Sequence, residues 1–278
     1  MIALVTCADA RDLDTDLPLL LAELGDDAAV VVWDDPTVDW SIFDAVVIRS
    51  AWDYPGRRDE FLAWARRVSA NTSLWNPVEV LEWNTDKRYL DRLAAEGVAT
   101  VPTTFVVPGE SPAPDALAGD IVVKPTVGGG SKGVRRVTDD AEAAAAHVAA
   151  LHADGYVAMI QPYRANIDAD GETGLVYLGG DYSHAFEKSA ILAAPIEWEG
   201  TLYVKETIVA RTPTAEQRAL ADRIVARLPP TAYARIDLVP GTDGPELLEL
   251  ELTEPSLFLD TDPSAPARAA AAFRSLAS

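Results

Sequence analysis

The chain has 278 residues, of which 49% are hydrophobic and 24% charged, and its 23 basic and 44 acidic side chains give a net charge of −21. This length and apolar content support a sizeable core with two or three packed subdomains, and they exclude a mostly disordered chain. The acidic balance argues against nonspecific binding to nucleic acid or to an anionic membrane, although a solvated acidic surface accounts for it equally well.

Three features of the sequence bear on the location of the protein. No apolar run approaches about 18 residues, the length that a membrane-spanning helix needs. The first residues carry neither a basic flank nor a small-residue cleavage site, as a secretory signal would. The single cysteine, Cys7, cannot form an intrachain disulfide, which fits a reducing compartment. We therefore expect a cytoplasmic protein.

The first 84 residues are predicted to alternate between strand and helix. The predicted elements are strands at 2–6, 28–33 and 45–48 and helices at 15–24 and 57–69. This alternation is typical of a small parallel sheet covered by helices, in which ligands bind at the carboxyl ends of the strands. Residues 7–9 and 49–54 lie at such ends.

The rest of the chain is predicted to mix helices with mostly antiparallel strands. The predicted helices are 86–96 (capped by Asn84 or Thr85), 140–152, 214–228 (capped by Thr214) and 265–276. The predicted strands are 103–107, 121–124, 134–137, 156–160, 175–178, 182–186, 203–208, 233–238 and 248–252. We interpret His184, in one of these strands, as a structural residue.

The last two predicted strands form a hairpin that gathers carboxylates. Because side chains alternate along a strand, Arg235 and Asp237 share one face, and so do Glu249 and Glu251. A turn centred near Asp243 places Asp237 opposite Glu249 and Arg235 opposite Glu251, with the leucines facing the core. Three neighbouring carboxylates repel one another unless a cation lies between them, and oxygen ligands favour Mg²⁺ or Mn²⁺. An exposed amphipathic hairpin is the alternative interpretation.

A glycine-rich segment, 128–133, matches the dinucleotide-binding pattern G-x-G-x-x-G by letter only. It leads into the predicted strand 134–137, so no helix N-terminus is present to receive a pyrophosphate. The lysine also precedes the last glycine, which excludes a Walker A loop. We expect this segment to be a flexible flap that carries Ser131 and Lys132 and whose backbone N–H groups close over phosphates.

Lysine is rare in this chain. Five lysines stand against eighteen arginines, at positions 87, 124, 132, 188 and 205. Drift in codon usage explains their small number but not their positions, and a compact ammonium group suits phosphate oxygens.

The strand that ends at Gln161–Tyr163 would present backbone groups to an adenine edge, with Asp168 in reach of a ribose.

Together these segments resemble the ATP-grasp carboxylate–amine ligases over nearly the whole chain. The resemblance is carried by Lys87, Lys124, the glycine-rich flap, Gln161–Tyr163, Lys188, Arg235-x-Asp237 and Glu249-x-Glu251, in this order. Within the superfamily, residues 49–54 and 249–256 are most similar to the D-cycloserine synthetases, which are O-ureido-serine cyclo-ligases. Many superfamily members carry Asn at the position of Glu251, and the extra charge here still suits Mg²⁺.

The resemblance implies an α/β fold of three units: an N-terminal parallel α/β domain (1–84), a lid subdomain with the flap (85–160) and a C-terminal antiparallel catalytic subdomain (161–278). It also implies ATP and Mg²⁺, with Mn²⁺ as a substitute, and a small-molecule carboxylate that becomes an acyl phosphate before a nitrogen displaces the phosphate. Homodimers are common in this superfamily.

The resemblance further assigns roles to individual residues. The catalytic residues would be Arg235 and Lys188, and the metal ligands Asp237, Glu249 and Glu251. ATP would be bound by Lys87, Lys124, Gly129, Gly130, Ser131, Lys132, Gln161, Tyr163 and Asp168. The substrate would be bound by Arg49, Trp52, Asp53, Glu254 and Ser256. For Arg49 a structural salt bridge is the alternative.

Three other functions remain open from the residues alone. An intermolecular amino-acid ligase would share the fold and the first chemical step. A small-molecule kinase would release the phosphorylated substrate instead of coupling it. A nucleotide-binding oxidoreductase is disfavoured, because residues 7–10 show no glycine fingerprint after the first strand.

Overall fold

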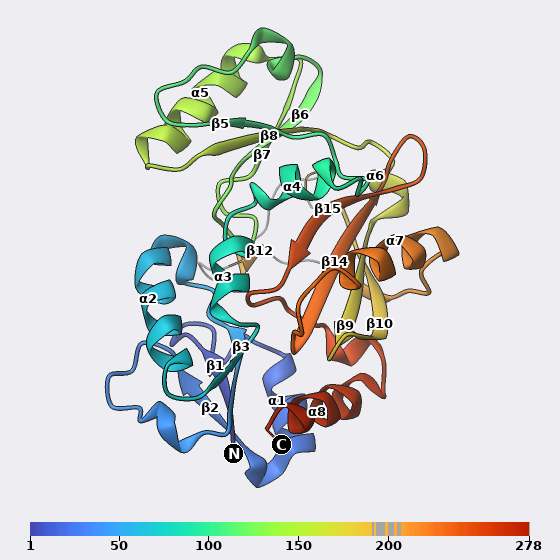
Figure 1. The fold of residues 1–278 in the computed structure, drawn as a ribbon. Coiled ribbons are helices and arrows are strands. Elements are labelled where there is room, and N and C mark those ends of the chain that lie inside the picture. The colour runs from blue at the N-terminus through green and yellow to red at the C-terminus, as the bar shows by residue number, and fades with distance from the viewer. Residues whose placement is uncertain (191, 193–197, 200–202, 205–206, 278) are drawn as a thin grey trace.

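The computed structural model describes residues 1–190, 192, 198–199, 203–204 and 207–277. Three main sheets, from the N-terminal, middle and C-terminal parts of the chain, occupy the bottom left, top and right of Figure 1. A small antiparallel pair joins β11 (Trp198–Glu199) and β12 (Tyr203–Val204). None of the helices in these described ranges has the length and apolarity needed to cross a bilayer.

The N-terminal sheet is parallel, as expected, with the strand order β2-β1-β3-β4. Its elements are β1 (Ile2–Thr6), α1 (Asp16–Leu24), β2 (Ala28–Val32), β3 (Ala45–Ser50), α2 (Arg58–Ser69) and β4 (Ser73–Trp75). Alternation along β1 sends Ile2 and Leu4 toward α1, whereas Ala3 and Val5 join the core under α2. One helix therefore covers each face, and the strand ends stay open to a ligand.

The middle sheet is antiparallel and carries the glycine-rich segment between two of its strands. Its elements are β5 (Thr104–Val106), β6 (Asp120–Pro125), β7 (Arg135–Thr138), α5 (Ala141–Ala153) and β8 (Ala158–Pro162). The strand order is β5-β8-β6-β7, and α5 packs on one face through Ala144, Val148 and Leu151. The segment joins β6 to β7, so the prediction of a strand after it is confirmed.

The C-terminal sheet is antiparallel and has the strand order β13-β10-β9-β14-β15. Its strands are β9 (Glu172–Leu178), β10 (Asp181–Lys188), β13 (Ile208–Ala210), β14 (Tyr233–Pro240) and β15 (Pro245–Glu251). The helices are the short α6 (Ile167–Asp170), α7 (Ala215–Val225) and α8 (Ala265–Leu276). Helix α7 begins with a capping box between Thr214 and Gln217, which confirms the predicted cap.

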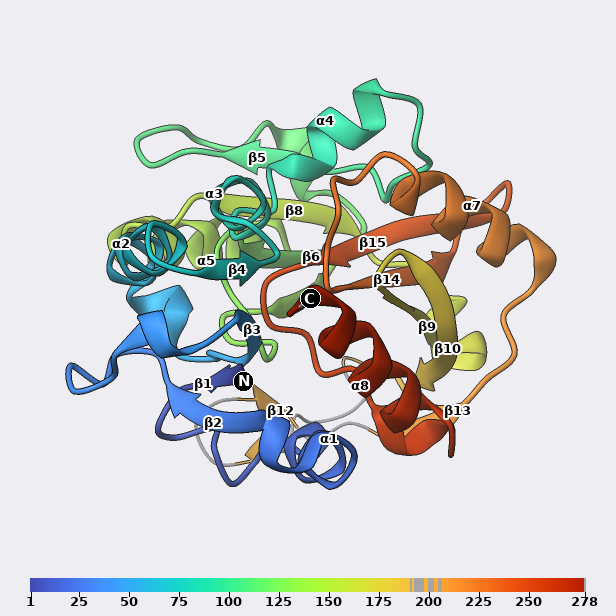
Figure 2. The same cartoon turned by 60° about the horizontal axis from the view of Figure 1, so that its bottom comes forward.

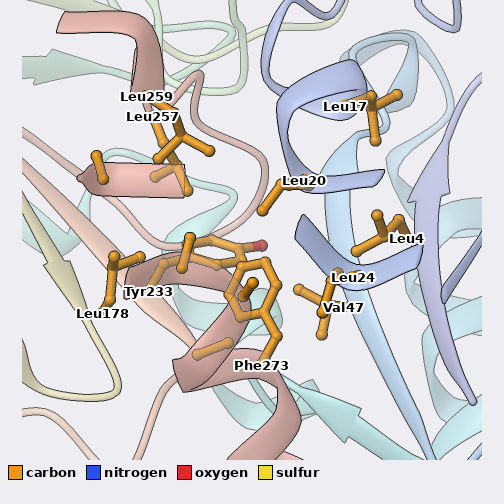
Figure 3. Close-up of a cluster of buried hydrophobic side chains, with 14 of the residues drawn as sticks. Leu4, Leu17, Leu20, Leu24, Val47, Leu178, Tyr233, Leu257, Leu259 and Phe273 are labelled. Carbon is orange, nitrogen blue, oxygen red and sulfur yellow. The ribbon is translucent and has the colours of Figure 1, made fainter. Parts of the chain in front are cut away.

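The N-terminal and C-terminal sheets share one hydrophobic core. Helix α8 packs against α1 where the two parts of the chain meet (Figure 2). Figure 3 shows this cluster, in which Leu20 and Leu24 of α1 accompany Tyr233 of β14 and Phe273 of α8. The shared core holds the ends of the parallel strands beside the carboxylate-bearing hairpin. The residue ranges that we assigned to the three units stay a prediction.

Two of the predicted elements differ in their bounds. The helix expected at 86–96 is present as α4 (Tyr89–Ala95) but begins three residues later, and a helix that was not expected, α3 (Val78–Asn84), precedes it. Thr85 ends α3, because its hydroxyl donates to the Leu81 carbonyl at 2.7 Å, and Lys87 N instead donates to Thr126 O at 2.9 Å. The strand expected at 203–208 is also divided, since β12 ends at 204 and β13 begins at 208. Lys205 lies outside the described residues.

Candidate active site

A cavity of about 580 Å³ lies where the three sheets meet. Most of the residues predicted to form the site line it: Trp52, Lys87, Lys124, Gly129, Gly130, Ser131, Lys132, Gln161, Tyr163, Lys188, Arg235, Glu249, Glu251, Glu254 and Ser256. Four predicted residues within the described ranges do not line it: Arg49, Asp53, Asp168 and Asp237. The fold thus brings together residues that are more than 200 positions apart in the sequence.

The hairpin β14–β15 has the register that alternation predicted. Asp237 pairs with Glu249 and Arg235 pairs with Glu251 across the two strands. Arg235 holds Asp237 with two hydrogen bonds, Nε to Oδ1 at 2.9 Å and Nη2 to Oδ2 at 2.7 Å, and it also contacts Glu251. Asp237 is 1% exposed, so it lies beneath the cavity wall whereas Glu249 and Glu251 form part of that wall.

One leucine of the hairpin does not face the core, contrary to the prediction. The register shifts between Asp237 and Leu238, so that Leu238 pairs with Leu247 and the next residue, Leu248, is the extra residue of a β-bulge. Leu247 is fully buried, while Leu248 lines the cavity with Val122 of β6. The bulge therefore supplies an apolar wall that alternation alone does not reveal.

Negative charge accumulates at the cavity wall. Burial raises the pKa of Glu251 to about 7, and the neighbouring Glu249 and Asp237 add to this shift. Burial also raises the pKa of Glu254 well above its ordinary value, with a further contribution from Glu251. Burial opposes the ionisation of Glu249 too, but Lys87 and Lys124 outweigh it and hold the pKa of this carboxyl below its ordinary value. A further cation at Glu251 and Glu254 would relieve the repulsion.

The donor set fits Mg²⁺ by its chemistry, because it offers carboxylate oxygens on one face of a hairpin. Within the described ranges, no three His, Cys, Asp or Glu side chains are already gathered into a metal cage. The reason is visible at each carboxylate: Arg235 joins Asp237 to Glu251, and Lys87 lies 2.9 Å from Glu249. Of the three predicted metal ligands, Glu251 is the one whose pKa is raised, so it has the most to gain from a metal ion.

Lysines 87, 124, 132 and 188 line the cavity, and three of them differ in their partners. Lys87 pairs with Glu249, and its Nζ also donates to Gly128 O at 2.7 Å. Lys188 lies between Asp237, at 3.1 Å, and Glu172. The ammonium group of Lys124 has neither a hydrogen bond nor an ion pair with the described part of the chain. Burial lowers the pKa of this group, and the nearby charges of Lys87 and Lys188 lower it further. This ammonium group favours the approach of an anion.

Glu172 is a cavity residue that the sequence analysis missed. It begins β9 and faces Lys188 across the β9–β10 pair, where the two residues are register partners. Gly179 and Gly180 mark the turn of this hairpin, but counting outward from them pairs Lys188 with Gly171. The register shift between Tyr182 and His184 moves the partner of Lys188 to Glu172, so the sequence carried no direct signal for this pair. Sequence reasoning treated β9 only as an apolar strand.

The glycine-rich segment folds as a tight, left-handed turn at the cavity mouth. Gly130, Ser131 and Gly133 have φ values of 58°, 62° and 75°, a backbone region that residues other than glycine rarely adopt. At Gly133 a Cβ atom would also approach Pro125 Cδ to 3.2 Å. The segment brings Ser131 and Lys132 to the cavity and then enters β7.

The end of β8 forms the opposite part of the cavity. Gln161 is 2% exposed and donates from Nε2 to Thr103 Oγ1 at 2.9 Å. Tyr163 lines the cavity, with the guanidinium of Arg136 3.5 Å from its ring centroid. The hydroxyl of Tyr163 donates to Asp168, and Asp168 does not line the cavity. The predicted contact of Asp168 with a ribose has no support in this arrangement.

Two of the predicted substrate residues serve the fold instead. Arg49 is 0% exposed, lies 3.5 Å from Asp16 and donates to Pro255 O at 2.7 Å, as the salt-bridge alternative predicted. Asp53 accepts a hydrogen bond from Trp33 Nε1 at 2.8 Å and pairs with Arg57 at 3.1 Å. Arg49 is enclosed by protein, whereas Asp53 is half-buried and is held by Trp33 and Arg57, and neither lines the cavity.

The comparisons with known proteins agree with this geometry. Residues 2–76 match the family described as the N-terminal domain of D-cycloserine synthetase DcsG. The cycloserine biosynthesis protein DcsG of Streptomyces lavendulae is 43% identical over 285 residues, which cover 93% of each chain. The crystal structure of D-cycloserine synthetase DcsG matches with a TM-score of 0.86 and 41% identity over 99% of each chain.

A more distant match concerns the fold alone. The D-alanine–D-alanine ligase of Bacillus anthracis has a TM-score of 0.72 at 15% identity, with 99% of this chain and 96% of that chain covered. The same ATP-grasp architecture thus persists where little sequence is shared. On the identity and coverage of the first relative, this chain belongs to the D-cycloserine synthetase family of ATP-grasp enzymes and is an ATP-dependent ligase.

Proposed function

We propose that this ligase depends on Mg²⁺ and forms a carbon–nitrogen bond through an acyl phosphate, closing O-ureido-D-serine to D-cycloserine. The observation that carries the proposal is the buried ammonium of Lys124, which has no ion pair among the described residues and shares its cavity with Glu249 and Glu251. A site of this kind suits a polyanion that arrives with a divalent cation. The choice of substrate rests on the relatives, which are named for cycloserine.

The lysines would receive the phosphates of ATP. Lys87 and Lys124 are placed for the inner phosphates, and Lys132 of the glycine-rich segment and Lys188 of β10 for the γ-phosphate. In the ligand-free protein, Lys87 and Lys188 are neutralised by carboxylates. Nucleotide binding would replace these ion pairs, while Lys124 has none to give up among the described residues.

Asp237, Glu249 and Glu251 are the residues that we propose as metal ligands. Mg²⁺ bound there would neutralise phosphate charge and polarise the phosphoryl group. Glu249 and Glu251 already face the cavity, whereas Asp237 would have to exchange its bonds with Arg235 and Lys188. Arg235 already lines the cavity, where its fixed positive charge would stabilise the negative charge that develops on the phosphoryl group during transfer.

The proposed reaction has three steps. One oxygen of the substrate carboxylate bonds to the γ-phosphorus while the bond to the bridging oxygen breaks, which releases ADP and leaves an acyl phosphate. The ureido nitrogen that is bonded to the side-chain oxygen then bonds to the acyl carbon, loses a proton and displaces inorganic phosphate, which closes the five-membered ring. Hydrolysis of the carbamoyl group on that nitrogen by one water releases carbon dioxide and ammonia and leaves D-cycloserine. The glycine-rich segment at the cavity mouth would exclude water from the intermediate, as closing loops do in other enzymes.

One part of the cavity offers groups that could bind an amino-acid substrate. Glu254 and Ser256 line it beside Trp52 and Tyr54. A carboxylate and a hydroxyl are hydrogen-bonding partners for an ammonium group, and the aromatic rings limit the size of the substrate. We therefore propose Trp52, Glu254 and Ser256 as substrate-binding residues.

A hydroxylamine trap tests the proposal and separates its alternatives. The protein is incubated with ATP, Mg²⁺ and O-ureido-D-serine, and the products are measured with and without hydroxylamine. ADP with D-cycloserine, diverted to a hydroxamate by hydroxylamine, is the expected result. ADP with a stable phosphorylated product would indicate a kinase, and turnover only after a second amino acid is added would indicate an intermolecular ligase. Absence of ADP formation with any amino-acid carboxylate would refute the proposal.

The site assignment has its own test. Lys124→Ala and Glu249→Ala are each expected to abolish ADP formation while the far-ultraviolet circular dichroism stays that of the wild type. Near-wild-type turnover in both variants would contradict the assignment. A cytoplasmic location and a homodimer stay predictions, to be checked by fractionation and by light scattering.

A further inference from the structure

The loop that carries the proposed substrate residues, residues 253–259, is held in an unusual way. Five consecutive carbonyl oxygens in this loop each accept a hydrogen bond from a side chain that lies outside the loop. The donors, in order along the loop from Thr253 to Leu257, are Tyr233 OH (2.7 Å), Trp52 Nε1 (3.1 Å), Arg49 Nη2 (2.7 Å), Arg235 Nη1 (2.9 Å) and His184 Nε2 (2.8 Å). Surface loops rarely have their carbonyls bound so completely by protein, so this loop belongs to the rigid part of the molecule.

Side chains alternate along the loop between the cavity and the core. Glu254, Ser256 and Phe258 line the cavity. Leu257 and Leu259 are fully buried and pack in the cluster that contains α1, as Figure 3 shows. A shift of one residue along the loop would exchange these two sets, so whatever fixes its register also fixes which groups face a substrate.

Asp16, the first residue of α1, holds this register from the N-terminal part of the chain. Its Oδ2 accepts from Leu257 N at 2.6 Å, and its Oδ1 accepts from Leu259 N at 2.8 Å. Between these two N–H groups lies Phe258, whose φ of 49° is uncommon for a residue other than glycine. A single carboxylate therefore holds both sides of a strained turn, and Phe258, at the centre of that turn, lines the cavity.

Arg49 completes the arrangement. It is 0% exposed, lies 3.5 Å from Asp16 and reaches the loop at Pro255 O. Leu257 and Leu259 would hold the loop against α1 by apolar contact alone, and a buried ion pair is seldom needed for stability. The ion pair adds a fixed register, because its hydrogen bonds reach specific backbone atoms of the loop: Asp16 accepts from two N–H groups, and Arg49 donates to one carbonyl oxygen.

We propose that Asp16 and Arg49 are positioning residues that fix the loop 253–259, and through it Glu254 and Ser256, for the substrate of the ligase. Neither residue lines the cavity, so both act through the loop. We expect their effect at Glu254 and Ser256, because Lys87 and Lys188, two of the lysines that we assign to ATP, are held by contacts outside this loop. The kinetic part of this inference rests on the proposed function, whereas the structural part does not.

Hydrogen exchange of the backbone amides tests the structural part without any substrate. In Asp16→Asn one carboxylate oxygen becomes an NH₂ group, which cannot accept from an amide N–H. We expect the amides of Leu257 and Leu259 to exchange at least about tenfold faster than in the wild type, with β14 unchanged. The matched control is Asp14→Asn, since Asp14 is also buried and bonds Asp16 N at 2.9 Å. Unchanged exchange at both leucines would overturn the proposal.

Steady-state kinetics with O-ureido-D-serine test the functional part. In Asp16→Asn we expect the KM for this probe to rise roughly 10- to 100-fold while the KM for ATP stays within about twofold, because misplacement of a binding loop acts on the group it contacts. Equal increases in both KM values would indicate general loosening and would overturn the proposal. If the wild type does not turn over this probe, the proposed substrate fails, and the exchange experiment alone decides.

A second variant guards against loss of folding. Arg49→Lys keeps the buried positive charge beside Asp16 but loses the planar guanidinium that reaches Pro255 O. We expect the KM for O-ureido-D-serine to rise by less than in Asp16→Asn while the KM for ATP stays nearly unchanged. We also expect faster amide exchange within 253–259. A variant with wild-type exchange and a wild-type KM for O-ureido-D-serine would remove Arg49 from the positioning role.

Discussion

Replacing Lys124 and Lys87 by methionine, one at a time, tests whether the charge arrangement of the cavity serves ATP. Both lysines are buried and line the same cavity, but Lys87 has Glu249 at 2.9 Å, whereas Lys124 has no ion pair in the part of the chain that the structure describes. Burial opposes the charge of both groups. The pKa of Lys124 is lowered as a result, while for Lys87 the nearby Glu249 reverses the effect and the pKa is raised. The two variants should therefore differ in the sign of their stability change.

The expected magnitudes rest on these contacts. Each lysine would contribute a charged hydrogen bond to phosphate, worth about 1.5–3 kcal/mol, so each variant should bind ATP about 10- to 150-fold more weakly. Lys87→Met leaves Glu249 without its closest cation. Breaking a buried pair costs about 3–5 kcal/mol, and because the side chain of Glu249 is 22% exposed we expect a smaller loss, roughly 1–3 kcal/mol. Lys124→Met removes a buried charge that the described residues do not neutralise, and it should raise the melting temperature of the ligand-free protein.

The pH dependence of the Lys124 variant gives a further check. A lysine whose folded pKa lies below its unfolded value destabilises the folded state while it is charged, and this penalty disappears as the pH rises from the folded pKa toward 10.5. The gain in melting temperature of Lys124→Met should therefore be largest at a pH below the folded pKa of Lys124 and should shrink as the pH rises toward 10.5.

The assays are isothermal titration with ATP in the presence of Mg²⁺ and thermal unfolding of the ligand-free protein. A control, Arg88→Met, removes an exposed cation that pairs with Asp86 outside the cavity, and it should leave ATP binding unchanged. Destabilisation by Lys124→Met, or wild-type ATP affinity in both lysine variants, would refute the reasoning.

Three further predictions concern single contacts. Gly133→Ala should destabilise the fold by about 1–2 kcal/mol in chemical denaturation, because φ is 75° and the new Cβ would meet Pro125 at 3.2 Å; a stabilised variant would contradict this. Thr214→Ala removes a capping box and should cost about 1 kcal/mol without changing kcat, whereas altered turnover would mean that α7 reaches the site. Leu248→Asp should raise the KM for ATP, measured by ADP release, because it places a charge on the apolar cavity wall.

Much of the fold could be predicted from local patterns. The parallel N-terminal sheet is encoded by alternating apolar runs and helices, and the C-terminal helix begins and ends where its apolar period predicted. Alternation along β14 and β15 could place Arg235 on one face with Asp237, and Glu249 on one face with Glu251, because side chains repeat every two residues. The bulge that makes Asp237 face Glu249 and not Leu248 lies outside that pattern. The glycine-rich segment could be placed between strands because residues 134–137, directly after it, have the pattern of a strand. In each case the information lies within a few residues of the element.

Other features depend on contacts between distant segments. Arg49 and Asp53 stand at the end of β3, where a ligand was expected, but Arg49 is buried against Asp16 and Asp53 is bonded to Trp33 and Arg57. Asp168 is held at the hydroxyl of Tyr163 by a hydrogen bond that no spacing reveals. Thr85 ends a helix instead of beginning one, because Lys87 N finds its acceptor on the loop after β6.

By itself, then, the sequence determined the elements, the hairpin that carries the carboxylates and the group of cations gathered for a phosphate-bearing ligand. Only the tertiary structure decided which of these side chains reach the cavity. The bulge that turns Leu248 outward and the contact of Asp16 with a loop more than 240 residues away illustrate the difference. Alternation and capping are properties of neighbouring residues, whereas burial and pairing depend on which distant surfaces the folded chain presses together.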